Sequence, residues 1–354
     1  MQQLVQLRGR GAPQNPRNRF VEAEYVPDPE AFDPDEPGPR TQFLHDHTRG
    51  IISRNDSPDI PFETSVNPYR GCEHGCIYCF ARPTHEYLGF SAGLDFETRI
   101  LVKHEAAELL RKELASPRWT PQPIAMSGVT DPYQPVERRL EITRGCLEVL
   151  AEFRNPVAMV TKNHMVTRDI DLLGELAQHQ AAVVNISITS LNEKLQRVME
   201  PRASTPARRL DAVRRLSEAG IPVRVLVAPV VPGLTDHEMS AILAAAAEAG
   251  AIAASYIPLR LPHGLKGLFE DWLETHFPDR KEKVLNRIRE MRGGKLYNSE
   301  WGTRMRGEGV FADQYEAMFG ALTRKLGLTR DIPPLSTAAF RQPHDTRGQM
   351  GLFE

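Results

Sequence analysis

Short apolar runs alternate with amphipathic segments between residues 62 and 262, and this alternation constrains the fold more than any other feature. Buried strands are predicted at 62–69, 123–128, 156–162, 183–190, 221–233 and 253–262. Helices are predicted between them at 104–115, 136–153, 167–180, 204–220 and 236–250. A strand and a helix that repeat about every 25 to 35 residues are typical of βα units around a parallel sheet. The repeat therefore predicts an α/β fold.

The number of predicted strands limits the possible architectures. Six strands precede residue 263, whereas a closed barrel of βα units needs eight. The periodicity alone fits an open, partial (β/α)6 barrel or a doubly wound sheet. In both architectures ligands bind at the carboxyl ends of the strands, so residues that carry chemistry are expected there.

The segments that flank this repeat differ from it in composition. Residues 1–45 begin with four arginines and no acids up to position 19, followed by seven acids and no bases up to position 36. Such a segment can bury little apolar surface, so a disordered tail is expected. The other expected parts are a core domain (46–263), a helical extension that caps the site (264–332) and a flexible C-terminus (333–354). Trp272 and Trp301 are expected to pack the extension against the core.

No sequence feature predicts a membrane or secretory location. The N-terminus lacks the apolar core of a signal peptide, and no apolar stretch reaches the roughly 18 to 20 residues of a membrane span. The net charge of −2 gives no global attraction to polyanions, so a nucleic-acid contact would need a local basic patch. We expect a cytoplasmic monomer, in which thiols stay reduced and a cysteine cluster binds metal or performs catalysis.

Three of the four cysteines share one loop, which follows the first predicted strand. They are Cys72, Cys76 and Cys79. Glycines at positions 71 and 75 allow the backbone to curl, so that the three sulfur atoms can converge on one point. A structural zinc site would need a fourth ligand, which His74, His85 or the distant Cys146 would have to supply. An iron–sulfur cluster usually takes four thiolates, so three thiolates leave one iron with an open position, as in catalytic metal sites.

The stretch Cys72-Glu-His-Gly-Cys76-Ile-Tyr78-Cys79 resembles the CxxxCxΦC motif of the radical S-adenosylmethionine superfamily. The resemblance implies a [4Fe–4S] cluster held by the three thiolates, with the amino and carboxylate groups of S-adenosylmethionine on the fourth iron. It also implies that an electron donor such as flavodoxin or ferredoxin reduces the cluster. Cleavage of S-adenosylmethionine then yields a 5′-deoxyadenosyl radical, which abstracts hydrogen from a substrate. Tyr78 would contact the adenine through its ring or the neighbouring backbone.

Residues 62–262 are similar to a narrower group, the spore photoproduct lyase-like proteins, often labelled DNA repair photolyases. The stretch MSGVTDPYQP (126–135) matches their second-strand motif, which holds the amino group of S-adenosylmethionine. The match implies this role for Ser127, Thr130 and Asp131, whose oxygens would accept charge-assisted hydrogen bonds. The alternative is that Thr-Asp-Pro only forms a turn.

Two further strand ends match the same group. The stretch VTKN (160–163) resembles its third strand, which implies that Lys162 pairs with the carboxylate of S-adenosylmethionine. The stretch NISITS (185–190) resembles its fourth strand, which implies that Ser187 hydrogen-bonds the same ligand. A serine in a strand is otherwise often only a small residue that fits its place.

The sequence departs from the lyase where the lyase carries the cysteine that quenches its product radical. This chain has Gly128 at that position, and glycine has no thiol hydrogen to give. Cys146 lies on an apolar helix face and is expected to pack in the core. The quenching step therefore cannot run as it does in the lyase, and the resemblance predicts the fold and the cofactors better than the substrate.

Two residues are candidates for chemistry on the substrate. His85 follows the cysteines closely enough to act as an acid or base, and Tyr133 could stack on a base or donate hydrogen. A pyrimidine lesion in DNA is the substrate that the resemblance implies, and a protein side chain, RNA or a metabolite are the alternatives. A different class of function is a non-catalytic iron–sulfur or zinc protein that binds nucleic acid through its arginine-rich N-terminus. The arginines at 208, 209, 214 and 215 are expected to form a solvated helix face.

Overall fold

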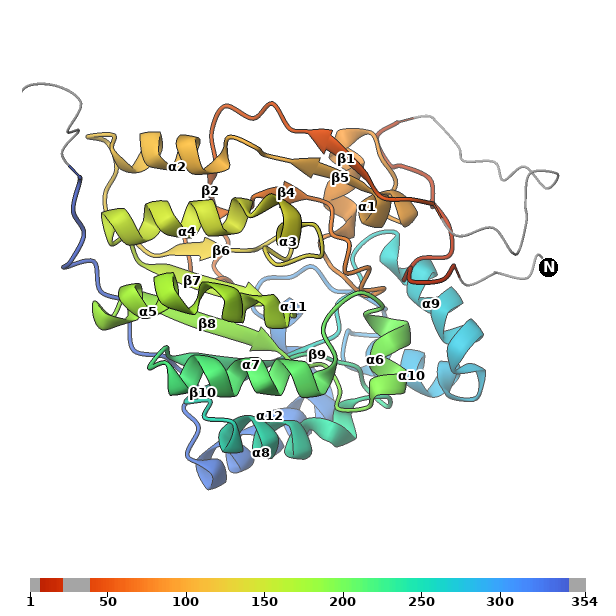
Figure 1. Ribbon diagram of the computed structural model, residues 1–354. Helices are drawn as coiled ribbons and strands as arrows, with labels where there is room; N and C mark the ends of the chain where they lie inside the picture. The colour runs from red at the N-terminus through yellow and green to blue at the C-terminus, as the bar shows by residue number, and fades with distance from the viewer. Residues whose placement is uncertain (1–6, 22–38, 344–354) are drawn as a thin grey trace, which may run out of the picture.

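The structure is a computed structural model that describes residues 7–21 and 39–343 (Figure 1). Its centre is a seven-stranded sheet with the strand order β10-β9-β8-β7-β6-β3-β2. The strands are β2 (Ile52–Arg54), β3 (Thr64–Val66), β6 (Ile124–Met126), β7 (Val157–Thr161), β8 (Ala182–Ser187), β9 (Val223–Val230) and β10 (Ala253–Pro258). All neighbouring pairs are parallel except β2 and β3, which pair antiparallel at one edge.

The parallel strands follow one another across the sheet in chain order. A doubly wound sheet instead reverses its strand order and carries helices on both faces. The chain order therefore selects the partial (β/α)6 barrel of the two predicted architectures. Each of the six predicted strands overlaps an observed strand, because strands buried on both faces are marked by continuous apolar runs.

The helices that connect the strands form a single layer, which Figure 1 shows stacked over one face of the sheet. They are α2 (Ala106–Leu114), α4 (Ile142–Phe153), α5 (Ile170–Gln178), α7 (Pro206–Glu218) and α8 (Met239–Glu248). In α4 the residues Cys146, Leu147, Leu150 and Phe153 recur three to four positions apart and are all buried. The packing role expected for Cys146 is therefore confirmed.

The helix predicted at 136–153 is two helices, α3 (Glu137–Leu140) and α4. Glu141 separates them, because its backbone has a left-handed φ of 52° that no α-helix can contain. The carboxylate of Glu137 accepts hydrogen bonds from the backbone N–H groups of Thr143 (3.0 Å) and Arg144 (3.3 Å) at the start of α4. The break thus depends on a side chain that caps the second helix, and apolar periodicity does not reveal such a cap.

A second sheet and the N-terminal residues lie beside the barrel. This sheet has the order β1-β5-β4, formed by β1 (Gln42–His45), β5 (Arg99–Val102) and β4 (Tyr69–Arg70). Residues 7–21, which we name the N-terminal strap, pack against η1 (Arg82–Leu88) and α1 (Leu94–Thr98) through buried hydrogen bonds. The predicted disorder is therefore wrong for the strap and for β1, while residues 1–6 and 22–38 lie outside the described residues.

The C-terminal extension is helical, as predicted. Its helices are α9 (Leu265–His276), α10 (Pro278–Glu290), α11 (Thr303–Arg306) and α12 (Gly309–Leu326). Apolar residues of α9 and α10 share a buried cluster with Cys76 and Tyr78, so these two helices cover the cysteine loop. Trp272 is buried in that cluster as expected, but Trp301 is exposed, so its predicted packing role is wrong.

The remaining described residues complete the barrel. Short helices follow three strands, namely η2 (His164–Asp169), α6 (Glu193–Met199) and η3 (Asp236–Glu238).

The structure describes residues 333–343 of the expected flexible C-terminus. Phe340 packs against Phe153, and the N–H of Arg341 donates to the Phe153 carbonyl. None of the described helices is both long and apolar enough to span a bilayer.

Candidate active site

The cysteine loop (residues 71–79) follows β4 and lies at the carboxyl ends of the parallel strands. Gly71 and Gly75 have left-handed φ angles of 79° and 66°, which glycine adopts readily. A Cβ atom at Gly75 would lie 2.7 Å from a carboxylate oxygen of Glu97, so the turn also needs the missing side chain. Cys72 and Cys76 are buried, Cys79 is half-buried, and all three are free thiols.

The donor set of this loop is three soft sulfur atoms, which suit an iron–sulfur cluster. Burial raises the pKa of all three cysteine thiols, and the negative charge of Asp131 raises the pKa of Cys72 further. Metal binding would release these protons, because the thiolate is the ligand. In the described part of the chain no group of three His, Cys, Asp or Glu side chains is arranged to hold a single metal ion. A cluster places each cysteine on a separate iron.

The backbone of the cysteine loop is bound to the segment that follows β6. The N–H of Glu73 donates to the side-chain oxygen of Gln134 (2.9 Å), whose amide nitrogen donates to the Gly71 carbonyl (3.3 Å). The carboxylate of Glu73 in turn accepts from the N–H of Val136 (2.8 Å). These reciprocal bonds fix the loop over the sheet, because each partner is itself buried.

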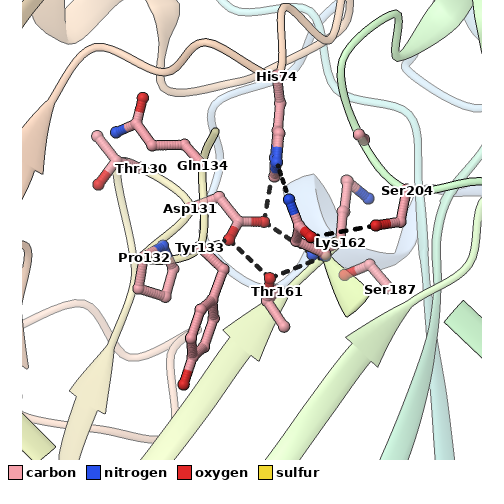
Figure 2. Close-up of polar contacts among 12 residues, drawn as sticks. His74, Thr130, Asp131, Pro132, Tyr133, Gln134, Thr161, Lys162, Ser187 and Ser204 are labelled. Carbon is pink, nitrogen blue, oxygen red and sulfur yellow. Dashed lines mark hydrogen bonds and ion pairs between the residues drawn. The ribbon is translucent and has the colours of Figure 1, made fainter. Parts of the chain in front are cut away.

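Asp131 lies at the centre of the polar network in Figure 2. One carboxylate oxygen accepts from the Thr161 hydroxyl (2.7 Å) and the Tyr133 N–H (2.9 Å). The other accepts from the Lys162 N–H (2.7 Å) and lies 3.3 Å from Nδ1 of His74, which belongs to the cysteine loop. Burial acts to raise the pKa of Asp131, but the charge of His74 and these hydrogen bonds lower it overall.

The network leaves Asp131 no free position for a ligand, since a carboxylate has about four lone-pair sites and the chain occupies all four. Direct contact between Asp131 and the amino group of S-adenosylmethionine, which the resemblance implied, is therefore not supported. Asp131 instead joins the cysteine loop to the end of β7. We treat it as a positioning residue.

Ser127 and Thr130 lie beside Asp131 at the end of β6, as expected. The hydroxyl of Ser127 donates to the Thr130 carbonyl (3.0 Å), and the hydroxyl of Thr130 donates to the Tyr69 carbonyl (3.4 Å). Each hydroxyl oxygen retains lone pairs that can accept from a ligand. A Cβ atom at Gly128 would contact only Asn67, at 3.7 Å or more, but the backbone φ of 124° at this position favours glycine over a cysteine.

Lys162 extends from the end of β7 into a buried group of polar side chains. Its ammonium donates to the Ala228 carbonyl (3.1 Å) and lies 3.5 Å from both the Thr189 hydroxyl and the Glu200 carboxylate. The ammonium also lies 5.7 Å from the centre of the Tyr78 ring. An anion of the chain itself therefore already neutralises the lysine that was expected to bind the ligand's carboxylate.

Glu200 organises this group, and sequence reasoning missed it. Its carboxylate accepts from the Tyr78 hydroxyl, from Thr189 (2.7 Å) and from the buried guanidinium of Arg209. Burial acts to raise the pKa of Glu200, but the charges of Arg209 and Lys162 lower it strongly overall. The same guanidinium donates to the backbone carbonyl of Ser187 (3.0 Å), whose side chain is buried at the end of β8.

Arg209 does not belong to a solvated helix face, so that prediction was wrong for this residue. A signal was present in the sequence of α7. Arg209 precedes Ala212, Val213 and Leu216 at helical spacings of three, four and seven, and all four residues are buried. An arginine on an apolar face needs a buried anion. Glu200, the residue that follows α6, supplies this anion.

His85 and Tyr133, the two catalytic candidates, are fully buried. His85 packs between Phe90 and Phe96, and its Nε2 lies 3.0 Å from the Arg99 carbonyl. Burial lowers the pKa of His85 to about 4, so the ring is neutral near pH 7.

Tyr133 points away from His74 and Lys162 in Figure 2, and its hydroxyl donates to Asp169 (3.0 Å). Burial and the Asp169 charge raise the pKa of Tyr133. Both side chains are buried in this arrangement, and among the described residues Nδ1 of His85 has no hydrogen-bond partner. The catalytic roles expected for His85 and Tyr133 stay predictions.

Replacing Glu200 with alanine is expected to lower the free energy of unfolding by about 3–5 kcal/mol, because it leaves the buried guanidinium of Arg209 without its anion. Urea denaturation of the two proteins measures the loss. Glu316→Ala is the matched control, since it breaks a half-exposed pair with Arg330 that contributes about 0–1 kcal/mol. Equal losses in the two variants would contradict the role given to Glu200.

The sequence of this chain is similar to a known protein family. The family model of the radical SAM superfamily matches residues 66–246, and this chain belongs to that superfamily. The superfamily implies S-adenosylmethionine as cosubstrate and a [4Fe–4S] cluster, and the three cysteines fall within the matched residues. An uncharacterized protein of Mycobacterium tuberculosis is 38% identical over 234 residues, which are 66% of this chain and 68% of that protein.

A solved structure and a phage protein are also similar to this chain. A spore photoproduct lyase mutant with bound AdoMet and a dinucleoside spore photoproduct superposes with a TM-score of 0.56, covering 81% of this chain and 80% of the lyase. The identity is 16%, so this likeness shows a shared fold. The radical SAM Nalpha-GlyT isomerase of Pseudomonas phage M6 is 27% identical over 199 residues, 56% of this chain and 38% of the isomerase.

Proposed function

We propose that this protein binds a [4Fe–4S] cluster through Cys72, Cys76 and Cys79 and uses it to cleave S-adenosylmethionine. The observation that carries the proposal is the glycine-shaped loop of three free cysteines at the carboxyl ends of a six-stranded parallel barrel. When bound and reduced by a donor such as flavodoxin or ferredoxin, the cluster would supply the electron for reductive cleavage of S-adenosylmethionine. The 5′-deoxyadenosyl radical formed in this way would take a hydrogen atom from the substrate.

The residues around the loop suit the other parts of S-adenosylmethionine. Lys162 presents an ammonium that can share its charge between Glu200 and the carboxylate of the ligand. Ser127 and Thr130 have hydroxyl oxygens that can accept from the ligand's ammonium. The buried Ser187 and the ring of Tyr78 lie on the same side as Lys162 and would border the adenosine.

The proposed substrate is a nucleic acid, specifically a pyrimidine lesion in DNA. Two likenesses support this choice: the lyase structures that share this fold hold a dinucleoside spore photoproduct, and the phage relative is named as a GlyT isomerase. Gly128 supplies no thiol to quench a product radical. A hydrogen atom must therefore return to that radical from another donor, and 5′-deoxyadenosine itself is one such donor.

Transfer of deuterium tests hydrogen abstraction from DNA. Reconstituted protein, dithionite and S-adenosylmethionine are incubated without oxygen with ultraviolet-irradiated oligonucleotides that contain deuterated thymidine. We expect deuterium in the 5′-deoxyadenosine, measured by mass spectrometry, and none with unirradiated oligonucleotides. Formation of 5′-deoxyadenosine that never carries deuterium from DNA would exclude this substrate and leave RNA, a protein side chain or a metabolite.

A further inference from the structure

Arg260 is the second residue after β10, at the mouth of the barrel. Its neighbours Leu259 and Leu261 are buried in the same apolar cluster as Cys76 and Tyr78. The side chain of Arg260 is half-buried, and its guanidinium lies 4.9 Å from the centre of the Phe80 ring. Phe80 follows Cys79 directly, so this arginine stands beside the proposed cluster.

Within residues 7–21 and 39–343 the guanidinium of Arg260 forms no hydrogen bond or ion pair, and its contact is the ring of Phe80. Burial lowers the pKa of Arg260, and the positive charge of Arg304 lowers it too. The acidic Asp59 acts on Arg260 only at longer range, because Asp59 is paired with Arg304 at 2.6 Å.

A third arginine adds to the positive charge here. Arg292 is buried and donates to the carbonyls of Leu259, Thr303 and Arg304 at 2.8–3.0 Å. Burial lowers the pKa of Arg292 to about 10, and the positive charge of Arg260 contributes to this lowering. These three arginines therefore add positive charge here, and among the described residues Arg260 is the one whose N–H groups donate no hydrogen bond.

Two large aromatic side chains are exposed beside these arginines, Phe80 at Arg260 and Trp301 at Arg304. Phe80 is 50% exposed and Trp301 is 56% exposed. The guanidinium of Arg304 lies 3.9 Å from the centre of the Trp301 ring, and Arg304 is fixed by Asp59, so this ring is held in place. Exposed aromatic rings beside arginines are typical of surfaces that stack nucleic-acid bases and bind phosphates.

We propose that Arg260 and Phe80 form a subsite for one nucleotide of a single-stranded or locally unpaired nucleic acid, next to the nucleotide that reacts. The guanidinium binds the phosphodiester and the ring stacks on the base. This inference rests on the proposed function, because it assigns the substrate class to residues of the same site. Arg260 and its neighbouring arginines also form the local basic patch that a chain of net charge −2 needs in order to bind nucleic acid.

Binding of a fluorescein-labelled single-stranded oligonucleotide to the reconstituted protein, followed by anisotropy, tests the subsite. Arg260→Gln is expected to weaken binding about tenfold and to reduce the dependence of log K on log salt by about 0.7, the share of one phosphate contact. Phe80→Leu is expected to weaken binding about fivefold or more with the salt dependence unchanged, because stacking carries no counterion release. Arg215→Ala, an exposed arginine on the outer helix α7, is the matched control and leaves binding unchanged.

Equal oligonucleotide affinity in the wild type and in both subsite variants would overturn the inference. Competition by thymidine monophosphate at the same concentration as the oligonucleotide would overturn it as well, since the ligand would then be a free nucleotide. The wild-type protein is assayed in parallel for 5′-deoxyadenosine without any substrate. If this product forms while no oligonucleotide binds, the subsite fails alone; if no product forms, the proposed function fails.

Discussion

Replacing Cys76 with alanine is expected to remove iron from the reconstituted protein and to abolish the formation of 5′-deoxyadenosine. A wild-type chain should bind about four iron atoms in a cluster, and two thiolates cannot retain a cluster that already lacks one protein ligand. Cys76 is also buried in an apolar cluster with residues of α9, so water cannot easily replace its sulfur. Iron and sulfide analysis, together with the visible absorption of the anaerobic protein, measures the loss.

Cys146→Ala is the control for this experiment. Cys146 is equally buried but lies in α4, within the main core and away from the loop. Its replacement should cost stability through the lost packing, about 1 kcal/mol for one small apolar group, while iron content stays at the wild-type value. Equal iron content in the Cys76 and Cys146 variants would contradict the assignment of the cluster.

The second large effect is expected at Gly11 in the N-terminal strap. The N–H groups of Gly11 and Ala12 donate to the buried carboxylate of Glu97 at 2.9 and 2.8 Å. A Cβ atom at Gly11 would lie 1.8 Å from the carbonyl oxygen of Gly75, which is backbone of the cysteine loop. Gly11→Ala should therefore displace either the strap or the loop, and lower the free energy of unfolding by about 1–3 kcal/mol.

The displacement should also reduce the iron content, because Glu97 connects the strap to the loop. Arg82 pairs with Glu97 and donates to the carbonyls of Cys76 (2.9 Å) and Gly75 (3.2 Å). Gly174→Ala is the matched control, since no atom lies within 4 Å of a Cβ at that position and α5 accommodates alanine. Unchanged stability and iron content in Gly11→Ala would show that the strap does not support the loop.

The strap also explains a limit of sequence reasoning. Its low apolar content and its arginines and prolines predict a disordered tail, because composition indicates only how much apolar surface a segment can bury. The strap is instead held by hydrogen bonds to Glu97 and Glu86, more than 60 residues further along the chain. Removing residues 1–45 would therefore disturb the site itself, and such a truncation cannot serve as a neutral test of nucleic-acid binding.

The barrel strands and the cysteine loop could be predicted for a different reason. Continuous apolar runs mark buried parallel strands, and the spacing of three thiols depends on local chain geometry alone. The partners of Asp131 and Lys162 could not be predicted, because His74, Thr161 and Glu200 are brought to them only by the fold. The positions of Ser127, Thr130, Lys162 and Ser187 match the expected strand ends, while their contacts with a ligand stay predictions.

The central claim is reductive cleavage of S-adenosylmethionine, and anaerobic reconstitution of the wild-type protein tests it most directly. The protein is loaded with iron and sulfide, reduced with dithionite and supplied with S-adenosylmethionine, without substrate. We predict a brown protein with about four iron atoms per chain, and 5′-deoxyadenosine and methionine that accumulate together in equal amounts. A colourless protein that retains zinc and forms no 5′-deoxyadenosine would contradict the account.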